Sequence, residues 1–193
     1  MNLGSKAIAI FASGEGSNAV AICSYFEGSS QITVSKLFCN NPKAKVISRL
    51  QEFQVPVTLV GQAQLSDKEF ISKELLGIDL IVLAGFLKLI PGFITKAFSG
   101  RILNIHPALL PKYGGKGMYG DKVHQAVLDA GESASGITIH QVTEHYDEGA
   151  VLFQAQIEIS KDDDLQSLKE KVQELEHHFY PRVIDELLKE KRL

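Results

Sequence analysis

The 193-residue chain is poor in cysteine and proline, has no tryptophan, and carries no excess of basic charge. Its two cysteines, Cys23 and Cys39, show neither CxxC nor Cys/His spacing, so we expect neither a disulfide framework nor a zinc site. Lys and Arg number 20 against 23 Asp and Glu, which gives a net charge of −3 and argues against a nucleic-acid partner. Every strongly apolar stretch is well short of the ~20 residues that a membrane helix needs. We therefore expect a cytoplasmic protein without a membrane partner.

The composition is that of an ordinary globular protein, with 45% hydrophobic and 22% charged residues. The length favours one domain over residues 1–193. Short β-rich runs alternate with helical segments through the first half, which is typical of βαβ crossovers. We expect an α/β protein with a Rossmann-like, open, mostly parallel sheet, helices on both faces, and some antiparallel pairing near the C-terminal end.

Individual elements follow from hydrophobic periodicity and turn signals. Strands are expected at residues 6–12, 32–38, 55–60, 78–84, 101–105, 136–142 and 149–159. Helices are expected at residues 18–26, 44–53, 66–76 and 121–130, in a short stretch from Pro91, and from Leu165 to the end. Ser66 and Glu69 have capping-box spacing and predict where the third of these helices begins. Pro181 is expected to kink or break the last helix.

A glycine-rich turn follows the first expected strand. Residues 14–19 fit the pattern G-x-G-x-x-A at the start of a helix, where free N–H groups and the helix dipole favour a phosphate. A tight turn without a ligand is the alternative. The second strand ends at residues 38–42 without the acid that would bind a dinucleotide's ribose, which favours a single phosphate over a nicotinamide dinucleotide. Lys43 and Lys45 keep NADP as a weaker alternative ligand.

A second polar cluster follows the strand at residues 101–105. Strand alternation places Asn104 and His106 on one face at the carboxyl end of a strand, where ligands gather in α/β sheets. Asn104 can donate to an oxyanion and His106 can donate or carry a proton. Asp147 is the predicted third member, and would raise the pKa of His106 if the two meet. Glu144 or Glu148 could take the place of Asp147. In the purely structural alternative, His106 is a hydrogen-bonded turn histidine and Asn104 is a capping residue.

The remaining histidines show no metal or nucleophile motif. His177 and His178 are adjacent on a helix and point about 100° apart, so they cannot share a ligand. We expect no metal, because no HExxH or comparable frame surrounds the other three, His124, His140 and His145. No G-x-S-x-G elbow is present, which disfavours a serine nucleophile. A pairing of Cys39 with a histidine stays open without local support.

Taken together, four motifs resemble the phosphoribosylglycinamide formyltransferase family in order and spacing over nearly the whole chain. They are the phosphate turn at 13–18, the strand end at 82–86, Asn-Ile-His-Pro-Ala-Leu-Leu-Pro at 104–111, and Asp-Glu-Gly at 147–149. The third motif alone would indicate only the wider formyltransferase fold. The phosphate turn and the short length select this family.

The resemblance implies a direct transfer, through a tetrahedral intermediate, of the formyl group from 10-formyltetrahydrofolate, a co-substrate, to the amine of 5'-phosphoribosylglycinamide in purine (IMP) biosynthesis. We expect small-molecule substrates as partners, and a monomer or homodimer. The resemblance implies a catalytic role for Asn104, His106 and Asp147. It implies contact of the substrate phosphate with Gly16, Ser17 and Asn18, and of its ribose with Glu176. Folate-binding residues would be Lys68, Leu87, Lys88, Leu89, Ile90 and Asn104. Lys68 stands where some relatives have Arg, and lacks its bidentate fork.

Three other functions stay open. Methionyl-tRNA formyltransferase is the nearest, but it resembles a longer protein with a basic domain, and a formyltetrahydrofolate hydrolase typically carries a regulatory domain. A non-catalytic nucleotide-binding module would use the glycine turn alone. Within the preferred interpretation, we expect the glycine-rich loop at 114–121 to be mobile and to order over bound folate.

Overall fold

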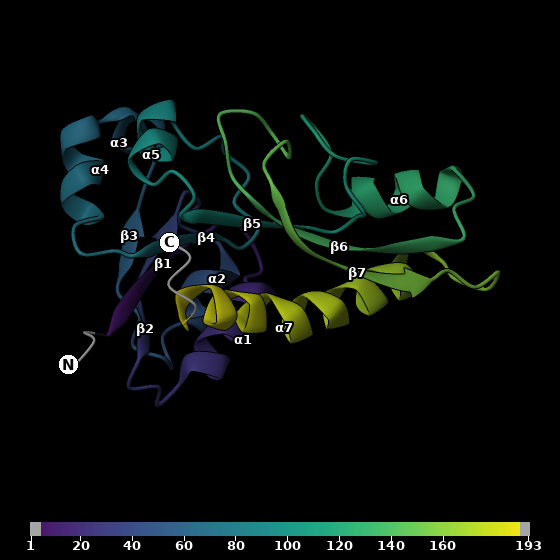
Figure 1. Ribbon diagram of the computed structural model, residues 1–193, viewed down its shortest axis with the longest axis horizontal. Coiled ribbons are helices and arrows are strands. Elements are labelled where there is room, and N and C mark those ends of the chain that lie inside the picture. The colour runs from purple at the N-terminus through teal and green to yellow at the C-terminus, as the bar shows by residue number, and fades with distance from the viewer. Residues whose placement is uncertain (1–4, 190–193) are drawn as a thin grey trace.

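The computed structural model describes residues 5–189 and contains a seven-stranded sheet in the order β3-β2-β1-β4-β5-β6-β7 (Figure 1). The first five strands pair in parallel, whereas β5–β6 and β6–β7 pair antiparallel. This confirms the predicted mostly parallel α/β sheet with antiparallel pairing toward the C-terminal end. The strands are β1 (Lys6–Ala12), β2 (Ile32–Cys39), β3 (Val57–Leu59), β4 (Leu80–Leu83), β5 (Ile102–His106), β6 (Ala134–Gln141) and β7 (Val151–Glu158).

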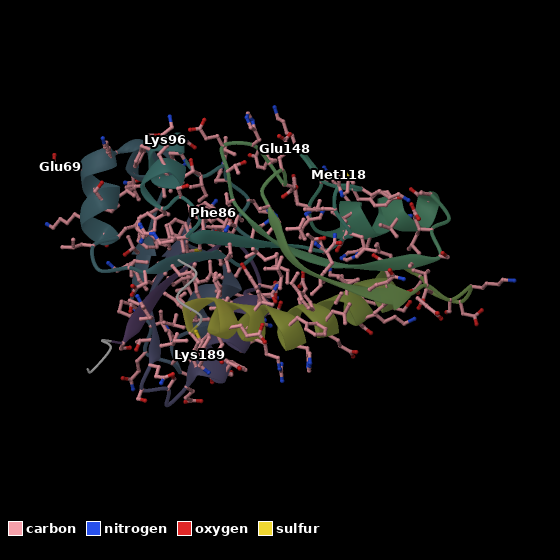
Figure 2. The ribbon with its side chains drawn as sticks, viewed as in Figure 1. Glu69, Phe86, Lys96, Met118, Glu148 and Lys189 are labelled. Atoms are coloured by element: carbon pink, nitrogen blue, oxygen red, sulfur yellow. The ribbon has the colours of Figure 1, made fainter. Side chains whose placement is uncertain are left out.

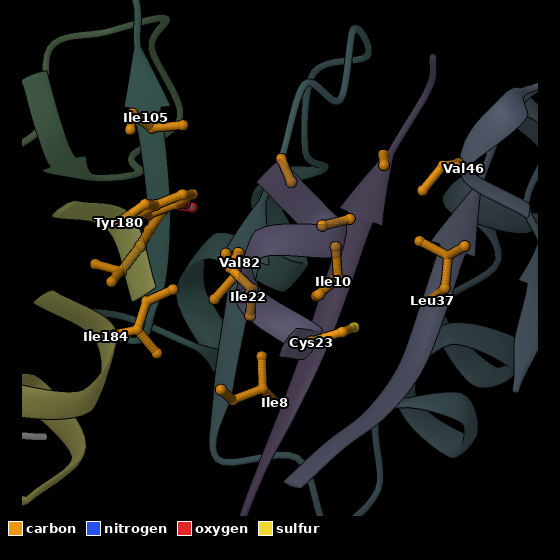
Figure 3. Close-up of a cluster of buried hydrophobic side chains, with 14 of the residues drawn as sticks. Ile8, Ile10, Ile22, Cys23, Leu37, Val46, Val82, Ile105, Tyr180 and Ile184 are labelled. Atoms are coloured by element: carbon orange, nitrogen blue, oxygen red, sulfur yellow. Dashed lines mark hydrogen bonds between the residues drawn. The ribbon is translucent and has the colours of Figure 1, made fainter. Parts of the chain in front are cut away.

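Helices cover both faces of the sheet, and the alternation of side chains along β1 shows how. Ile8 and Ile10 belong to one apolar cluster, whereas Ala9 and Phe11 belong to a second cluster on the opposite face. Tyr180 and Ile184 of the long C-terminal helix pack into the first cluster (Figure 3). The helices are α1 (Ser17–Phe26), α2 (Lys45–Arg49), α3 (Gln62–Ser66), α4 (Lys68–Glu74), α5 (Gly92–Ala97), α6 (Asp121–Asp129) and α7 (Leu165–Lys189).

The helix predicted at residues 66–76 begins differently from the prediction. Ser66 ends the short helix α3, and Asp67 is the N-cap of α4, where its carboxylate accepts a hydrogen bond from the Phe70 N–H at 3.0 Å. The Ser66–Glu69 capping box was therefore wrong, because the neighbouring aspartate is an equally good cap one residue later. The helix predicted at 44–53 is also shorter, since α2 ends at Arg49.

Pro181 does not divide the last helix. The helix α7 runs unbroken from Leu165 to Lys189, with Pro181 buried inside it. A proline at such a position loses one backbone hydrogen bond. Tyr180, which is fully buried, and Ile184 anchor this part of α7 in the core, and the Arg182 side chain donates to the carbonyl oxygen of His178. Of the helices within residues 5–189, none combines the length and the apolar character needed to cross a membrane.

Candidate active site

A cavity of about 290 Å³ lies at the carboxyl ends of β4 and β5. Its walls come from the segment after β4, the long loop after β5, the β6–β7 connection, and one face of α7. Phe86, Met118 and Glu148 mark the first three of these segments in Figure 2. The position follows the general rule that ligands of open α/β sheets bind outside the carboxyl ends of the strands.

Asn104 meets His140 across the β5–β6 ladder inside this cavity. The two residues are register partners, and the Asn104 Nδ2 lies 3.0 Å from the His140 Nε2. The other ring nitrogen, Nδ1, is 2.9 Å from the carbonyl oxygen of Gln141 and donates to it. The Asn104 Nδ2 can only donate, so the His140 Nε2 accepts; one Asn104 N–H binds His140 and the second is left for a ligand.

His106 is buried one strand repeat beyond Asn104. Its Nε2 lies 2.7 Å from the carbonyl oxygen of Tyr113 and donates to it, while its Nδ1 lies 3.7 Å from the Asp147 Oδ2. Burial lowers the pKa of His106, and the negative charge of Asp147 opposes this without reversing it. Asp147 therefore acts on His106 in the predicted direction, but the net shift of the His106 pKa is downward because desolvation is larger.

Asp147 connects both histidines to the loop after β5. The Gly115 N–H donates to its Oδ2 at 2.8 Å, and its Oδ1 lies 3.6 Å from the His140 Nε2. Burial acts to raise the pKa of Asp147, but His140, the Gly115 N–H and the charge of His106 outweigh burial and lower it. The backbone of Asp147 is left-handed, with φ 56°, a strained conformation that is common at functional sites. An ionised carboxylate thus faces two imidazoles.

The glycine turn after β1 contacts α7 rather than standing alone. Gly16 has φ 77°, and a Cβ at this position would lie 2.4 Å from the Val46 Cγ2, so both backbone and space require glycine. The Gln173 Nε2 donates to the Ser17 Oγ at 2.9 Å. The predicted phosphate turn and α7 therefore form one wall, of which Asn18, but neither Gly16 nor Ser17, lines the cavity.

Asn18 and Glu176 meet where this wall borders the cavity. The Asn18 Nδ2 donates to the Glu176 Oε2 at 2.8 Å, and both residues line the cavity. Burial raises the pKa of Glu176 to about 7, although the hydrogen bond from Asn18 acts in the opposite direction. The Asn18 Oδ1 is buried and has no hydrogen-bond partner within the described part of the chain.

Comparison with known proteins identifies the family. A family described as formyl transferase matches residues 6–184. The chain belongs to the formyl transferase family. Phosphoribosylglycinamide formyltransferase from Bacillus subtilis (strain 168) is 37% identical over 190 residues, which are 95% of each chain. The resemblance inferred from the motifs is therefore confirmed.

Further formyl transferase relatives agree. The chloroplastic phosphoribosylglycinamide formyltransferase of Arabidopsis thaliana is 49% identical over 115 residues, 60% of this chain and 39% of that relative, and the match to the Vigna unguiculata protein covers 36% of its length. The chain thus spans well under half of these plant relatives. Among solved structures, phosphoribosylglycinamide formyltransferase from Anaplasma phagocytophilum superposes with a TM-score of 0.88 at 29% identity, covering 97% of this chain and 89% of that chain.

The predicted folate residues of this formyl transferase fall into two groups. Leu87, Lys88, Leu89 and Ile90 line the cavity. The Leu87 N–H donates to the Ser13 Oγ at 2.9 Å, which fixes this segment to the end of β1, and Leu87 and Leu89 are exposed apolar side chains. Lys68 begins α4 and is not among the residues that line the cavity.

The cavity residues that sequence reasoning missed include His140, His124 and Gln173. His140 was considered only as a metal ligand, for which no motif exists. The usable signal was strand alternation, because Thr138 and His140 alternate with Ile137 and Ile139 in β6, as Asn104 and His106 alternate with Leu103 and Ile105 in β5. The antiparallel register that pairs them is not visible in the sequence.

Proposed function

We propose that the chain transfers the formyl group of 10-formyltetrahydrofolate to the amine of 5'-phosphoribosylglycinamide in purine (IMP) biosynthesis. One observation carries the proposal: an amide, an imidazole and a carboxylate, those of Asn104, His106 and Asp147, line one cavity although they come from separate segments. Amine attack on a formyl carbonyl needs a donor for the oxyanion, a path for the proton and correct placement. These three side chains supply the first two.

Asn104 supplies the oxyanion donor in this proposal. One of its N–H groups is engaged by His140, which holds the amide plane and leaves the other N–H for the formyl oxygen. A donor of this kind is typically worth ~3 kcal/mol in the transition state. The half-buried position of Asn104 strengthens this interaction, because it limits competition from water.

Proton transfer falls to His106 and Asp147. The 3.7 Å between the His106 Nδ1 and the Asp147 Oδ2 is too long for a direct hydrogen bond, so a water or the substrate amine beside the pair can hydrogen-bond to both. The amine loses a proton as its nitrogen bonds to the formyl carbon, and Asp147 and His106 are the acceptors within reach. When the tetrahedral intermediate collapses, the bond between the formyl carbon and N10 of the folate breaks, and N10 takes the proton from the same pair, so that tetrahydrofolate leaves. Proton transfer by a placed side chain contributes about 10²- to 10⁴-fold to rate.

The cavity divides into two halves that suit the two substrates. Asn18, Gln173 and Glu176 are polar and lie beside the phosphate turn, which suits a phosphoribosyl group. The segment at 87–90 offers exposed apolar side chains and backbone groups on the other side, which suits a pterin ring.

Both substrates are small molecules, and the expected active form remains a monomer or homodimer in the cytoplasm. The proposed chemistry depends on neither the oligomeric state nor the compartment, because every side chain that takes part in it lines one cavity of a single chain.

A single assay tests the proposal. The protein is mixed with 10-formyltetrahydrofolate, with and without phosphoribosylglycinamide, and folate absorbance is followed. We expect a change only when both compounds are present. A change without the second compound would show hydrolysis, and binding without any change would show a non-catalytic module.

A further inference from the structure

We propose that Asn40, the first residue after β2, is a positioning residue that acts through Ser13 to hold the folate segment, residues 85–90, in place. The inference rests on the proposed function, which assigns the folate to this segment. Every residue of the segment lines the cavity, whereas neither Asn40 nor Ser13 is among the described residues that do. Asn40 would therefore act on folate binding without touching the ligand.

Ser13 holds both ends of the turn that begins the folate segment. Its backbone N–H donates to the carbonyl oxygen of Gly85 at 3.1 Å, and its Oγ accepts a hydrogen bond from the Leu87 N–H at 2.9 Å. Gly85 has a left-handed backbone, with φ 74°, which lets the chain turn sharply after β4. The place of Leu87 relative to the sheet therefore depends on where the Ser13 Oγ lies.

The Asn40 side chain determines where that oxygen lies. The Ser13 O–H donates to the Asn40 Oδ1 at 2.6 Å, and Ser13 is only 7% exposed. A serine side chain has three staggered rotamers and its hydroxyl has one proton, which here is committed to Asn40. The lone pairs of the oxygen are left for the Leu87 N–H, so the bond to Asn40 holds Ser13 in the rotamer that anchors the folate segment.

An aromatic contact supports the same segment from β2 but does not involve Asn40. Phe38, in β2, stacks on Phe11 with 4.5 Å between the ring centroids, and Phe11 packs edge to face with Phe86 at 5.2 Å. Phe11 and Phe38 are fully buried, and aromatic pairs of this kind add to the stability that burial provides. Removing the Asn40 side chain leaves this apolar support intact, so we expect a local displacement of the segment rather than unfolding.

The folate segment continues from the strand end that faces Asn104. It begins two residues after Leu83, which is the register partner of Asn104 in the β4–β5 ladder. Displacing the segment would move the pterin relative to the Asn104 amide and weaken the contacts of the folate. The polar half of the cavity comes from α1 and α7 instead, so we expect the effect to be confined to the folate.

Titration calorimetry with tetrahydrofolate, the expected product, measures this effect without turnover. We expect Ser13→Ala and Asn40→Ala each to raise the Kd by about 3- to 10-fold, which corresponds to the loss of one neutral hydrogen bond. The double variant Ser13→Ala/Asn40→Ala should match Ser13→Ala alone, because Asn40 acts through the Ser13 hydroxyl. The matched control is Asn41→Ala, because Asn41 is the next residue and its Oδ1 accepts from the Lys43 N–H at 3.0 Å within the same turn. Its Kd should equal that of the wild type.

Hydrogen exchange reports on the anchoring of the segment itself. Hydrogen-bonded backbone amides exchange slowly, and the Leu87 N–H loses its acceptor in Ser13→Ala. Peptides that cover residues 85–90 should exchange faster in Ser13→Ala and Asn40→Ala than in the wild type and Asn41→Ala. In turnover, the KM for the folate should rise by the same factor as the Kd, and the KM for phosphoribosylglycinamide should not change. A merely structural role would lower the melting temperature without this selectivity.

An unchanged exchange rate at residues 85–90 or an unchanged Kd in Asn40→Ala would overturn the inference. A double variant that binds tetrahydrofolate more weakly than Ser13→Ala would also overturn it, because Asn40 would then act by a route other than the Ser13 hydroxyl. Wild-type protein that binds no tetrahydrofolate would refute the proposed function and the inference with it. The two failures are distinguishable, because one is seen in the wild type and the other only in the variants.

Discussion

Asn104 and His140 are 36 positions apart in the sequence, and their side chains meet 3.0 Å apart across the β5–β6 ladder. His140 is itself held by the carbonyl oxygen of Gln141. The two hydrogen bonds that link Gln141 to His140 and His140 to Asn104 therefore fix which face of the Asn104 amide is presented to the cavity. Orientation by a fixed neighbour is what makes a single amide effective as an oxyanion donor.

Replacing His140 with phenylalanine should lower kcat while the KM values change little. The variant loses the acceptor that holds the Asn104 amide, and misplaced donors typically cost about 10- to 100-fold in rate. Steady-state kinetics with the double variant Asn104→Ala/His140→Phe provides the control. The two losses should not add, because both act through one amide. Additive losses would show that His140 acts independently of Asn104.

Glu176 should make the folded state less stable as pH rises from about 4.5 to about 7. Its folded pKa, about 7, lies above the ordinary value of 4.5, so the folded state binds the proton more tightly than the unfolded state. The contribution is complete below pH ~4.5 and is lost as pH passes the folded pKa. Melting temperatures across this window should fall more steeply for the wild type than for Glu176→Gln.

The exposed neighbour Glu174 gives the matched control, since Glu174→Gln should leave the wild-type pH dependence intact. Parallel curves for the wild type and Glu176→Gln would contradict the assignment of the raised pKa.

Gly149→Ala should destabilise the fold strongly. A Cβ at Gly149 would lie 1.7 Å from the carbonyl oxygen of Gln141, which is backbone and cannot move aside. We expect a loss of about 2 kcal/mol or more in denaturant unfolding. Gly61→Ala is the control, because its Cβ would meet only the flexible end of Gln64 at 3.0 Å. Similar stabilities for the two variants would refute this packing argument.

The loop at 114–120 should become less sensitive to trypsin when the folate co-substrate binds. It contains three glycines in the left-handed region, Gly115, Gly117 and Gly120, and several of its residues line the cavity. A ligand in contact with the loop would restrict the local opening that cleavage after Lys116 requires. Cleavage rates that are equal with and without ligand would contradict closure of this loop over folate.

Local patterns predicted most of the fold. The strand at residues 6–12 was predicted with its observed bounds, because β1 is an apolar run between turn signals. Predictions failed where several residues compete for one local role or where packing overrides propensity. Asp67 replaced Ser66 as a cap, and core packing carried α7 through Pro181.

The residues of the candidate site were predicted or missed for the same reasons. Asn104 and His106 were predicted from a single strand and its following loop, for which alternation is sufficient. His140 and His124 were missed because their places in the cavity depend on the β5–β6 register and on the contact between α6 and α7, which no local pattern encodes. The convergence of Asp147 on His106 depends likewise on the β6–β7 connection.

The most direct test of the account is single-turnover formyl transfer by purified Asn104→Ala, compared with the wild type at saturating concentrations of both substrates. We predict a rate about 10²- to 10³-fold lower, because one preorganised oxyanion donor is removed. The melting temperature should be unchanged, because the substitution leaves the fold intact. A rate within a few-fold of the wild type would contradict the role given to this amide and the active site built around it.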